Sequence, residues 1–193
     1  MPEIHSVAVF CGSSSGTNPA FAAGARELGH GLAAAGMRLV YGGGRVGLMG
    51  AIADAVVEAG GVVLGVIPEF LARLEVAHTG IAALAITDSM HSRKQLMFAE
   101  ADAFVSLPGG LGTLDETIEI ITWRQLGLHD KPVLLCDIAG SAAPLLAAIE
   151  AAIGFGFAPP GARNLFEIAD GVAALLQRLR GLPRAAAVPA DRL

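Results

Sequence analysis

The chain has 193 residues, of which 53% are hydrophobic and only 16% are charged, and its formal net charge is −5. This length suits one domain that buries most of its apolar surface without disulfide or metal support. The acidic balance argues against a broad nucleic-acid-binding surface, and no apolar run is long enough to span a membrane. The first residues lack a basic segment followed by a long apolar one, so we expect a cytoplasmic protein.

Apolar runs alternate with helix-like patterns along the chain. In chain order, the predicted strands cover residues 5–11, 37–42, 61–67, 81–86, 103–107 and 132–137. The predicted helices cover residues 19–35, 47–59, 90–101, 113–127, 142–153 and 170–180. This alternation predicts an α/β fold: a Rossmann-like, doubly wound parallel sheet with helices on both faces. We assign residues 1–181 to a single domain and residues 182–193 to a flexible C-terminal tail.

Three of the predicted strands end in loops rich in glycine or serine. These loops cover residues 11–16, 42–47 and 108–113. Ligands of doubly wound sheets bind beyond the carboxyl ends of the strands. Two of the loops, after the second and fifth strands, have the same order of strand, glycine cluster and helix, so they could form a site from two sides.

The sequence from Leu107 to Glu116, LPGGLGTLDE, is the most informative of these segments. Its glycines allow positive φ and close approach of a ligand, and the helix that follows directs N–H groups and a partial positive charge toward an anion. The pattern predicts a phosphate site with the Glu116 carboxylate beside whatever the phosphate carries. The same residues also fit a plain strand-to-helix turn, in which Thr113 and Glu116 form a capping box.

Cysteine and histidine patterns indicate no metal site. Cys11 and Cys136 lie near the ends of apolar runs, as small buried hydrophobic residues do. The chain has no CxxC motif, and its five histidines form no metal-binding pair of the HExxH kind. We therefore expect neither a structural metal nor a cofactor.

The 107–116 segment resembles the glycine-rich signature of the LOG ("Lonely Guy") family, the cytokinin riboside 5'-monophosphate phosphoribohydrolases, which are often labelled lysine decarboxylases. Further likenesses occur in the same order along the chain. They are the segments YGGGRVGLMG at 41–50, VIP at 66–68, MHSRK at 90–94 and WRQLGLHDKP at 123–132. The resemblance covers roughly residues 4–157, and the combination of motifs is far more specific than one glycine pattern.

Functional residues follow from the resemblance position by position. It implies that Arg93 and Glu116 are catalytic, although Arg93 and Lys94 alone could be a solvated helix face. Ser13 and the pair Gly43–Gly44, in the first two loops, are further candidates for ligand contact. The full set of expected substrate contacts is Ser13, Gly43, Gly44, Glu75, Arg93, Lys94, Gly109, Gly110, Leu111, Gly112, Thr113, Leu114, Asp115, Glu116 and Thr122.

The resemblance implies hydrolysis of the N-glycosidic bond of an adenosine 5'-monophosphate, N6-modified in the preferred substrate, to free base and ribose 5-phosphate. It also implies a homodimer, which agrees with the surplus of apolar residues. One alternative is a non-catalytic Rossmann-like nucleotide carrier or sensor, which would be expected to lack the Arg93–Glu116 pair. Another is a pyridoxal-dependent lysine decarboxylase, for which only Lys94 and Lys131 could form the Schiff base.

Overall fold

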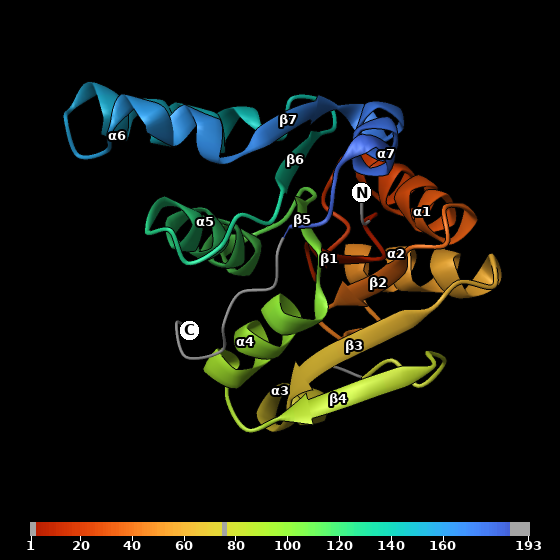
Figure 1. The fold of residues 1–193 in the computed structure, drawn as a ribbon. Helices are drawn as coiled ribbons and strands as arrows, with labels where there is room; N and C mark the ends of the chain where they lie inside the picture. Colours follow the sequence, from red (N-terminus) through yellow and green to blue (C-terminus); the bar gives the residue numbers. More distant parts are fainter. Residues whose placement is uncertain (1–2, 75–76, 186–193) are drawn as a thin grey trace.

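The computed structural model describes residues 3–74 and 77–185, and within them seven parallel strands form one twisted sheet (Figure 1). The strands are β1 (Ser6–Phe10), β2 (Arg38–Tyr41), β3 (Val63–Pro68), β4 (Ala83–Thr87), β5 (Ala103–Ser106), β6 (Val133–Asp137) and β7 (Glu167–Asp170). Their order across the sheet is β4-β3-β2-β1-β5-β6-β7. Val7 of β1 lies opposite Leu39 on one side and Ala103 on the other. The predicted Rossmann-like parallel sheet is confirmed.

Helices cover both faces of this sheet (Figure 1). They are α1 (Pro19–Ala34), α2 (Gly47–Glu58), α3 (Glu69–Leu74), α4 (Met90–Glu100), α5 (Leu111–Gln125), α6 (Ala143–Gly154) and α7 (Gly171–Gly181), with a 3₁₀ turn, η1 (Pro160–Leu165). Asn18 caps α1 by accepting from the Ala20 N–H, and Ser89 and Ser92 form a capping box on α4. In contrast, α2 and α5 begin at glycine loops without a side-chain cap.

Alternate residues of each strand enter two separate hydrophobic cores. Val7 and Val9 of β1 pack with α1, α2 and α7 on one face. Ala8 and Phe10 pack with α4 and α5 on the other. Because every central strand is covered on both faces, its sequence is apolar throughout, which explains why the strands could be read as uninterrupted apolar runs.

The structure differs from the sequence prediction in three additional elements, one helix start and the first part of the tail. The helix α3, the turn η1 and the edge strand β7 were not predicted. The fifth helix begins at Leu111, two residues before the predicted start at 113. The first part of the predicted tail is anchored: Leu182 is buried in the core, and Arg184 Nε lies 2.7 Å from Asp102 Oδ1. Residues 186–193 of the predicted tail lie outside the described residues.

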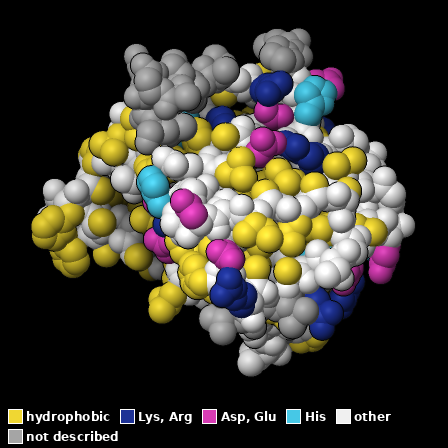
Figure 2. All heavy atoms as spheres, turned by 90° about the horizontal axis from the view of Figure 1, so that it is seen from below, with side chains coloured by type: hydrophobic (Ala, Val, Ile, Leu, Met, Phe, Trp, Pro, Cys, Tyr) yellow, Lys and Arg dark blue, Asp and Glu magenta, His cyan; other side chains and the backbone are white. Residues whose placement is uncertain are grey.

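Large apolar side chains remain exposed on the molecule. Three of them, Leu111, Leu114 and Ile118, lie along α5, and a fourth, Leu126, is its C-cap. We call these four residues the α5 stripe. Figure 2 shows hydrophobic side chains spread over much of the face seen from below, with basic side chains standing beside acidic ones. Of the helices in the described ranges, none is long and apolar enough to cross a membrane.

Candidate active site

The loops after β1, β2 and β5 meet at the carboxyl edge of the sheet. The N–H of Gly12, after β1, donates to the Pro108 carbonyl after β5 at 3.1 Å. The Gly12 carbonyl in turn accepts from the N–H of Leu48, at the start of α2, at 3.0 Å. The helices that follow β1 and β5 cover opposite faces, so a crevice opens between these two strands. The glycine loops thus gather at one edge, as predicted.

Two cavities lie on either side of Gly110 at this edge. The first, of about 270 Å³, contains the side chains of Arg93 and Glu116. Its other lining residues are Cys11, Gly12, Ser13, Met49, Leu71, Met90, Gly110, Leu111, Gly112 and Thr113. The second, of about 420 Å³, is bounded by residues 12–16, Phe21, Leu48 and the Pro108–Gly110 turn. Only the first cavity brings ionisable side chains to the glycine loop.

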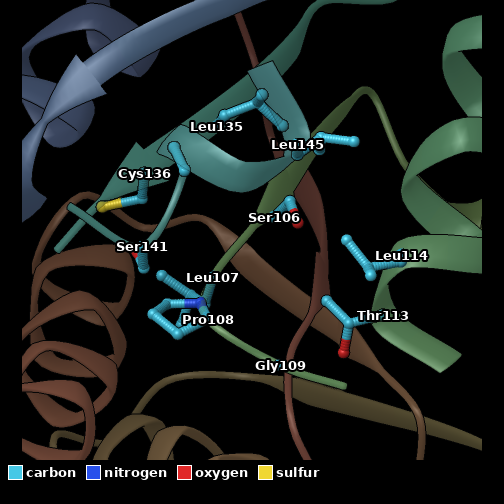
Figure 3. Close-up of a pocket in the computed structure, with 11 residues that line it drawn as sticks. Ser106, Leu107, Pro108, Gly109, Thr113, Leu114, Leu135, Cys136, Ser141 and Leu145 are labelled. Atoms are coloured by element: carbon cyan, nitrogen blue, oxygen red, sulfur yellow. The ribbon is translucent and has the colours of Figure 1, made fainter. Parts of the chain in front are cut away.

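A small third cavity, of about 50 Å³, lies behind the glycine loop between β5, β6 and α5 (Figure 3). Leu135 and Leu145 contribute apolar walls, and the Thr113 hydroxyl points toward the Gly109 segment (Figure 3). A Cβ at Gly109 would collide with Thr113 Oγ1 and would lie 2.9 Å from the Gly12 nitrogen. Gly109 is therefore required by the packing of the loop itself.

The start of α5 corrects the predicted capping box. Gly110 is the N-cap, and no side chain caps the helix, so Thr113 lies within the first turn instead of preceding it. The N–H groups of a first turn have no intrahelical acceptor. A Cβ at Gly110 or Gly112 would meet nothing within 4 Å, so this turn is open to a ligand. Its N–H groups and dipole suit a phosphate.

Arg93 of α4 and Glu116 of α5 form a buried ion pair in the first cavity. Arg93 Nη2 lies 3.0 Å from Glu116 Oε1, and the two side chains are 10% and 8% exposed. Within the described part of the chain, neither Glu116 Oε1 nor Arg93 Nε has a well-directed hydrogen-bond partner. A buried polar atom without a partner is costly, so the pair retains hydrogen-bonding capacity that the described residues do not satisfy.

Burial raises the pKa of Glu116 above its ordinary value, although Arg93 and Lys94 oppose this change. Lys94 Nζ lies 2.8 Å from Asp115 Oδ2 and 3.3 Å from Glu119 Oε2. Burial alone would lower the pKa of Lys94, but its hydrogen bonds to Asp115 and Glu119 outweigh burial and raise it. Lys94 therefore carries a firm positive charge beside the catalytic candidate.

The other predicted site residues are placed in different ways. Ser13 lines both cavities. Gly43, at φ +76°, packs against Ile67 and Leu84, and Gly44 pairs with Ala77, so this glycine pair lies behind the cavity wall.

Leu114 and Asp115 are exposed beside the first turn of α5. Thr122 is exposed two turns further along, with its hydroxyl donating to the Ile118 carbonyl at 2.8 Å. Glu75 lies outside the described residues.

Several residues of the first cavity were missed by the sequence analysis. Met49, Leu71 and Met90 form an apolar wall next to the ion pair. Leu71 belongs to α3, which was itself not predicted, whereas Met49 and Met90 stand inside quoted motifs but look like ordinary core residues. Cys11 also lines this cavity, and burial, with a smaller contribution from Glu116, raises the pKa of its thiol. Such a thiol stays protonated and is a poor nucleophile.

Metal ligation has no candidate among the residues that the structure describes. No three or more His, Cys, Asp or Glu side chains gather there in a way that could hold an ion. The chemistry available at the first cavity is that of a buried carboxylate, a guanidinium, an ammonium and free backbone N–H groups. This set suits a phosphorylated substrate with a polar centre next to its phosphate.

Comparisons with known proteins identify the family of this chain. A family model described as "Possible lysine decarboxylase" matches residues 49–179. A probable cytokinin riboside 5'-monophosphate phosphoribohydrolase of Oryza sativa subsp. japonica is 47% identical over 90% of this chain and 76% of its own length. A cytokinin riboside 5'-monophosphate phosphoribohydrolase of Arabidopsis thaliana is 44% identical over 90% of this chain and 76% of its own length. The enzyme of the same name from Rhodococcoides fascians is 46% identical over 84% of this chain and 83% of its own length.

Among solved structures, the molybdenum cofactor carrier protein of Chlamydomonas reinhardtii superposes with a TM-score of 0.69, covering 91% of this chain and 95% of its own at 21% identity. That likeness concerns the fold alone. The sequence relatives are far more similar, and they extend across the glycine loops, α4 and α5. The chain belongs to the LOG family, whose curated relatives are named cytokinin riboside 5'-monophosphate phosphoribohydrolases.

Proposed function

We propose that this protein hydrolyses the N-glycosidic bond of a nucleoside 5'-monophosphate, preferably an N6-modified AMP, to free base and ribose 5-phosphate. One observation carries the proposal: the buried Arg93–Glu116 pair stands one turn from the uncapped N-terminus of α5. Relatives that are 43–47% identical carry the corresponding enzyme name. A cytoplasmic location remains a prediction from the sequence.

In this proposal the substrate phosphate binds at the first turn of α5. Gly110, Gly112 and Thr113 supply backbone N–H groups there, and Ser13 adds a hydroxyl from the opposite loop. Binding energy gained at the phosphate, away from the reacting bond, then holds the ribose next to Glu116. The base would lie against the apolar wall formed by Met49, Leu71 and Met90, which are soft and adaptable enough for an alkylated purine.

The chemistry assigned to this pair follows from the charge that develops during cleavage. Loss of the base leaves positive charge on C1' of the ribose, in an oxocarbenium-like transition state. The Glu116 carboxylate stabilises that charge and orients or deprotonates the attacking water. Arg93 holds the ribose or phosphate oxygens and keeps Glu116 in place, since its planar guanidinium presents several donors at once.

A non-catalytic carrier or sensor is the alternative from another class. The fold would serve it equally well, as the likeness to the molybdenum cofactor carrier protein illustrates. A carrier needs the anion-binding helix end but has no use for a carboxylate whose pKa is raised in a cavity. The Glu116 side chain therefore favours turnover over binding alone.

The decarboxylase alternative has poor candidates for its Schiff base. Lys94 is engaged with Asp115 and Glu119, which raise its pKa and keep the amine protonated. Lys131, whose pKa burial lowers to about 8, precedes β6 and so lies at the opposite edge of the sheet from the glycine loops. Neither lysine combines a free amine with a phosphate site, as pyridoxal chemistry requires.

We also propose that the protein is a homodimer formed through the α5 stripe. Four large apolar side chains on α5 and its C-cap, from Leu111 at 86% exposure to Leu126 at 66%, are an unusual surface for a monomer. Thr122 lies on the same exposed face, away from the cavity of its own chain. A second copy packed here would bring Thr122 to the neighbouring site, which would reconcile its expected role with its position.

Chromatographic assay of base release tests the proposed activity. AMP and isopentenyladenosine monophosphate are incubated in parallel with the wild-type protein and with Glu116→Gln, and AMP binding is measured by calorimetry. We expect base and ribose 5-phosphate from the wild type, and a rate lower by about 10²-fold or more in the variant with AMP still bound. AMP binding without base release from the wild type would support the carrier alternative.

A further inference from the structure

The glycine segment after β2 is held in place from outside by residues 77–80. The Gly43 carbonyl accepts a hydrogen bond from the His78 N–H at 3.1 Å, and Gly44 forms an isolated antiparallel bridge with Ala77. The segment lies between β2, which ends at Tyr41, and α2, which begins at Gly47. Its inner side packs on β3, where a Cβ at Gly43 would lie 3.3 Å from the Val66 nitrogen, and residues 77–80 hold its outer side.

The His78 ring fixes that outer segment. Its Nδ1 accepts from the Gly80 N–H at 3.1 Å, which leaves the proton on Nε2, and Nε2 donates to Asp54 Oδ1 of α2 at 2.9 Å. His78 is 8% exposed, whereas the Asp54 side chain is 59% exposed. A buried imidazole with both nitrogens bonded has a single orientation, so it ties residues 77–80 to α2.

The glycine segment matters because Arg93 rests on it. A Cβ at Gly42 would collide with Arg93 Nη2 and would lie 3.0 Å from Met49 Sδ. Apart from Glu116, the polar contact of the guanidinium is a long one, from Nη1 to Met90 Sδ at 3.5 Å, and Nε is without a partner among the described residues. The Gly42 backbone is therefore a main support that holds the guanidinium against Glu116.

We propose that His78 is a positioning residue for Arg93. It acts through the Gly43 carbonyl and the Gly42 backbone, and its own side chain bonds Asp54 on α2, outside the cavity. This inference rests on the proposed hydrolysis. The phosphate site at α5 is not part of this chain of contacts, so loss of the His78 side chain should act through Arg93 alone and lower kcat much more than it weakens AMP binding.

Steady-state kinetics of His78→Ala, His78→Gln and Asp54→Asn with AMP test the proposal. We expect kcat of His78→Ala to fall by about 10-fold or more, with KM within about 3-fold of the wild type, because a small misplacement of a catalytic group is costly. Gln can still donate to Asp54, and Asn can still accept from His78, so both conservative variants should recover most of kcat. An equal loss in His78→Gln and His78→Ala, or a change in KM alone, would overturn the proposal.

A double-mutant cycle separates positioning from general damage to the fold. In an Arg93→Ala background, His78→Ala should cause little further loss, because there is no guanidinium left to position. Leu179→Ala, in the core of α7, is the matched control: it lowers thermal stability but should leave kcat intact. Full additivity of the His78→Ala and Arg93→Ala losses would contradict the proposed coupling.

A structural readout keeps this inference distinct from the proposed function. The buried Arg93 Nε–H should give a slowly exchanging ¹⁵N NMR signal, identified by its loss in Arg93→Lys. We expect this signal to exchange faster in His78→Ala and to be unchanged in Leu179→Ala. If the wild type fails to release base, the proposed function is wrong; if the Arg93 signal is the same in His78→Ala as in the wild type, the positioning role is wrong.

Discussion

Arg93 Nη2 lies 3.0 Å from Glu116 Oε1, although the two residues belong to helices that follow different strands. The pair is formed because α4 and α5 pack on the same face of the sheet, sharing a core with Phe98 and Ile120. A guanidinium and a carboxylate buried together are strongly coupled, and removal of one leaves the other uncompensated.

Arg93→Lys keeps the positive charge but removes the planar fork that rests on Gly42. We expect kcat with AMP to fall by about 10²-fold, because an ammonium cannot replace bidentate contacts to the ribose or phosphate. Arg178→Lys, in the exposed ion pair with Glu167, is the matched control, because it makes the same exchange outside the site. Wild-type turnover in Arg93→Lys would show that the guanidinium geometry is unimportant.

Gly42→Ala places a methyl group where Arg93 Nη2 and Met49 Sδ now lie. Gly42 is not in the left-handed region, so the effect should be steric, with Arg93 displaced and kcat reduced by about 10-fold or more. Gly154→Ala, at the end of α6, where nothing lies within 4 Å of the new Cβ, is the matched control. The comparison needs kcat and thermal stability of both variants; equal kcat would contradict the prediction.

Gly112→Ala and Gly109→Ala should separate ligand binding from folding. Nothing surrounds a Cβ at Gly112, so in the helix the substitution should stabilise the free protein by up to about 1 kcal/mol. The same methyl group would obstruct a phosphate at the first turn of α5, and we expect AMP affinity to fall about 10-fold, or about 1.4 kcal/mol. Gly109→Ala would instead collide with Thr113 Oγ1 and lower stability. Thermal melts with and without AMP distinguish the two.

The acid limb of the pH–rate profile should reflect Glu116. Its pKa is raised above 4.5 by burial, and the reaction needs the ionised carboxylate, so kcat should decline at a higher pH than for an exposed glutamate. Lys94 lowers the pKa of Glu116, whereas Asp115 raises it. Lys94→Ala should therefore move the acid limb to still higher pH. An unchanged limb in Lys94→Ala, measured beside Lys131→Met, would argue against Glu116 as the titrating group.

Ile118→Arg and Leu126→Arg introduce charge into the α5 stripe. If this stripe is the interface between two copies, the charge must be buried without a partner, and both variants should be monomeric by light scattering at concentrations where the wild type is dimeric. Ile86→Arg changes an apolar residue of β4 that is 62% exposed, and it should leave the mass unchanged. A dimeric Ile118→Arg would place the interface elsewhere.

Much of the architecture could be predicted from local sequence. The central strands β1, β2, β3 and β5 are covered on both faces, so they are continuous apolar runs bounded by glycine and proline. The strand β7 (Glu167–Asp170) is short and lies at the edge of the sheet, where a strand does not have to be apolar throughout, so its sequence did not indicate a strand. α3 and η1 are also short, at six residues each, and their patterns are too brief to show a helical period.

The candidate site also has a part that could be predicted from the sequence and a part that could not. The glycine loop could be found because its glycines form a compact sequence pattern, although none of Gly109, Gly110 and Gly112 has positive φ in the structure. The resemblance of adjacent motifs supplied Arg93 and Glu116 as candidates. The contacts between segments that are distant in the chain could not be predicted from the sequence. Thr113, predicted to be a helix cap, lies in the first turn of a helix that begins at Leu111, and it packs against Gly109, which in turn lies next to Gly12.

By itself, then, the sequence determined the parallel α/β fold and the position of the glycine loop, because each depends on residues close together in the chain, whereas Arg93 and Glu116 became candidates through motifs that resemble the LOG family. Only the tertiary structure decided that Arg93 rests on Gly42, that His78 holds Gly43, and that Met49, Leu71 and Met90 share one wall. These contacts depend on which strands are neighbours and on which face each helix packs, and no local pattern encodes either.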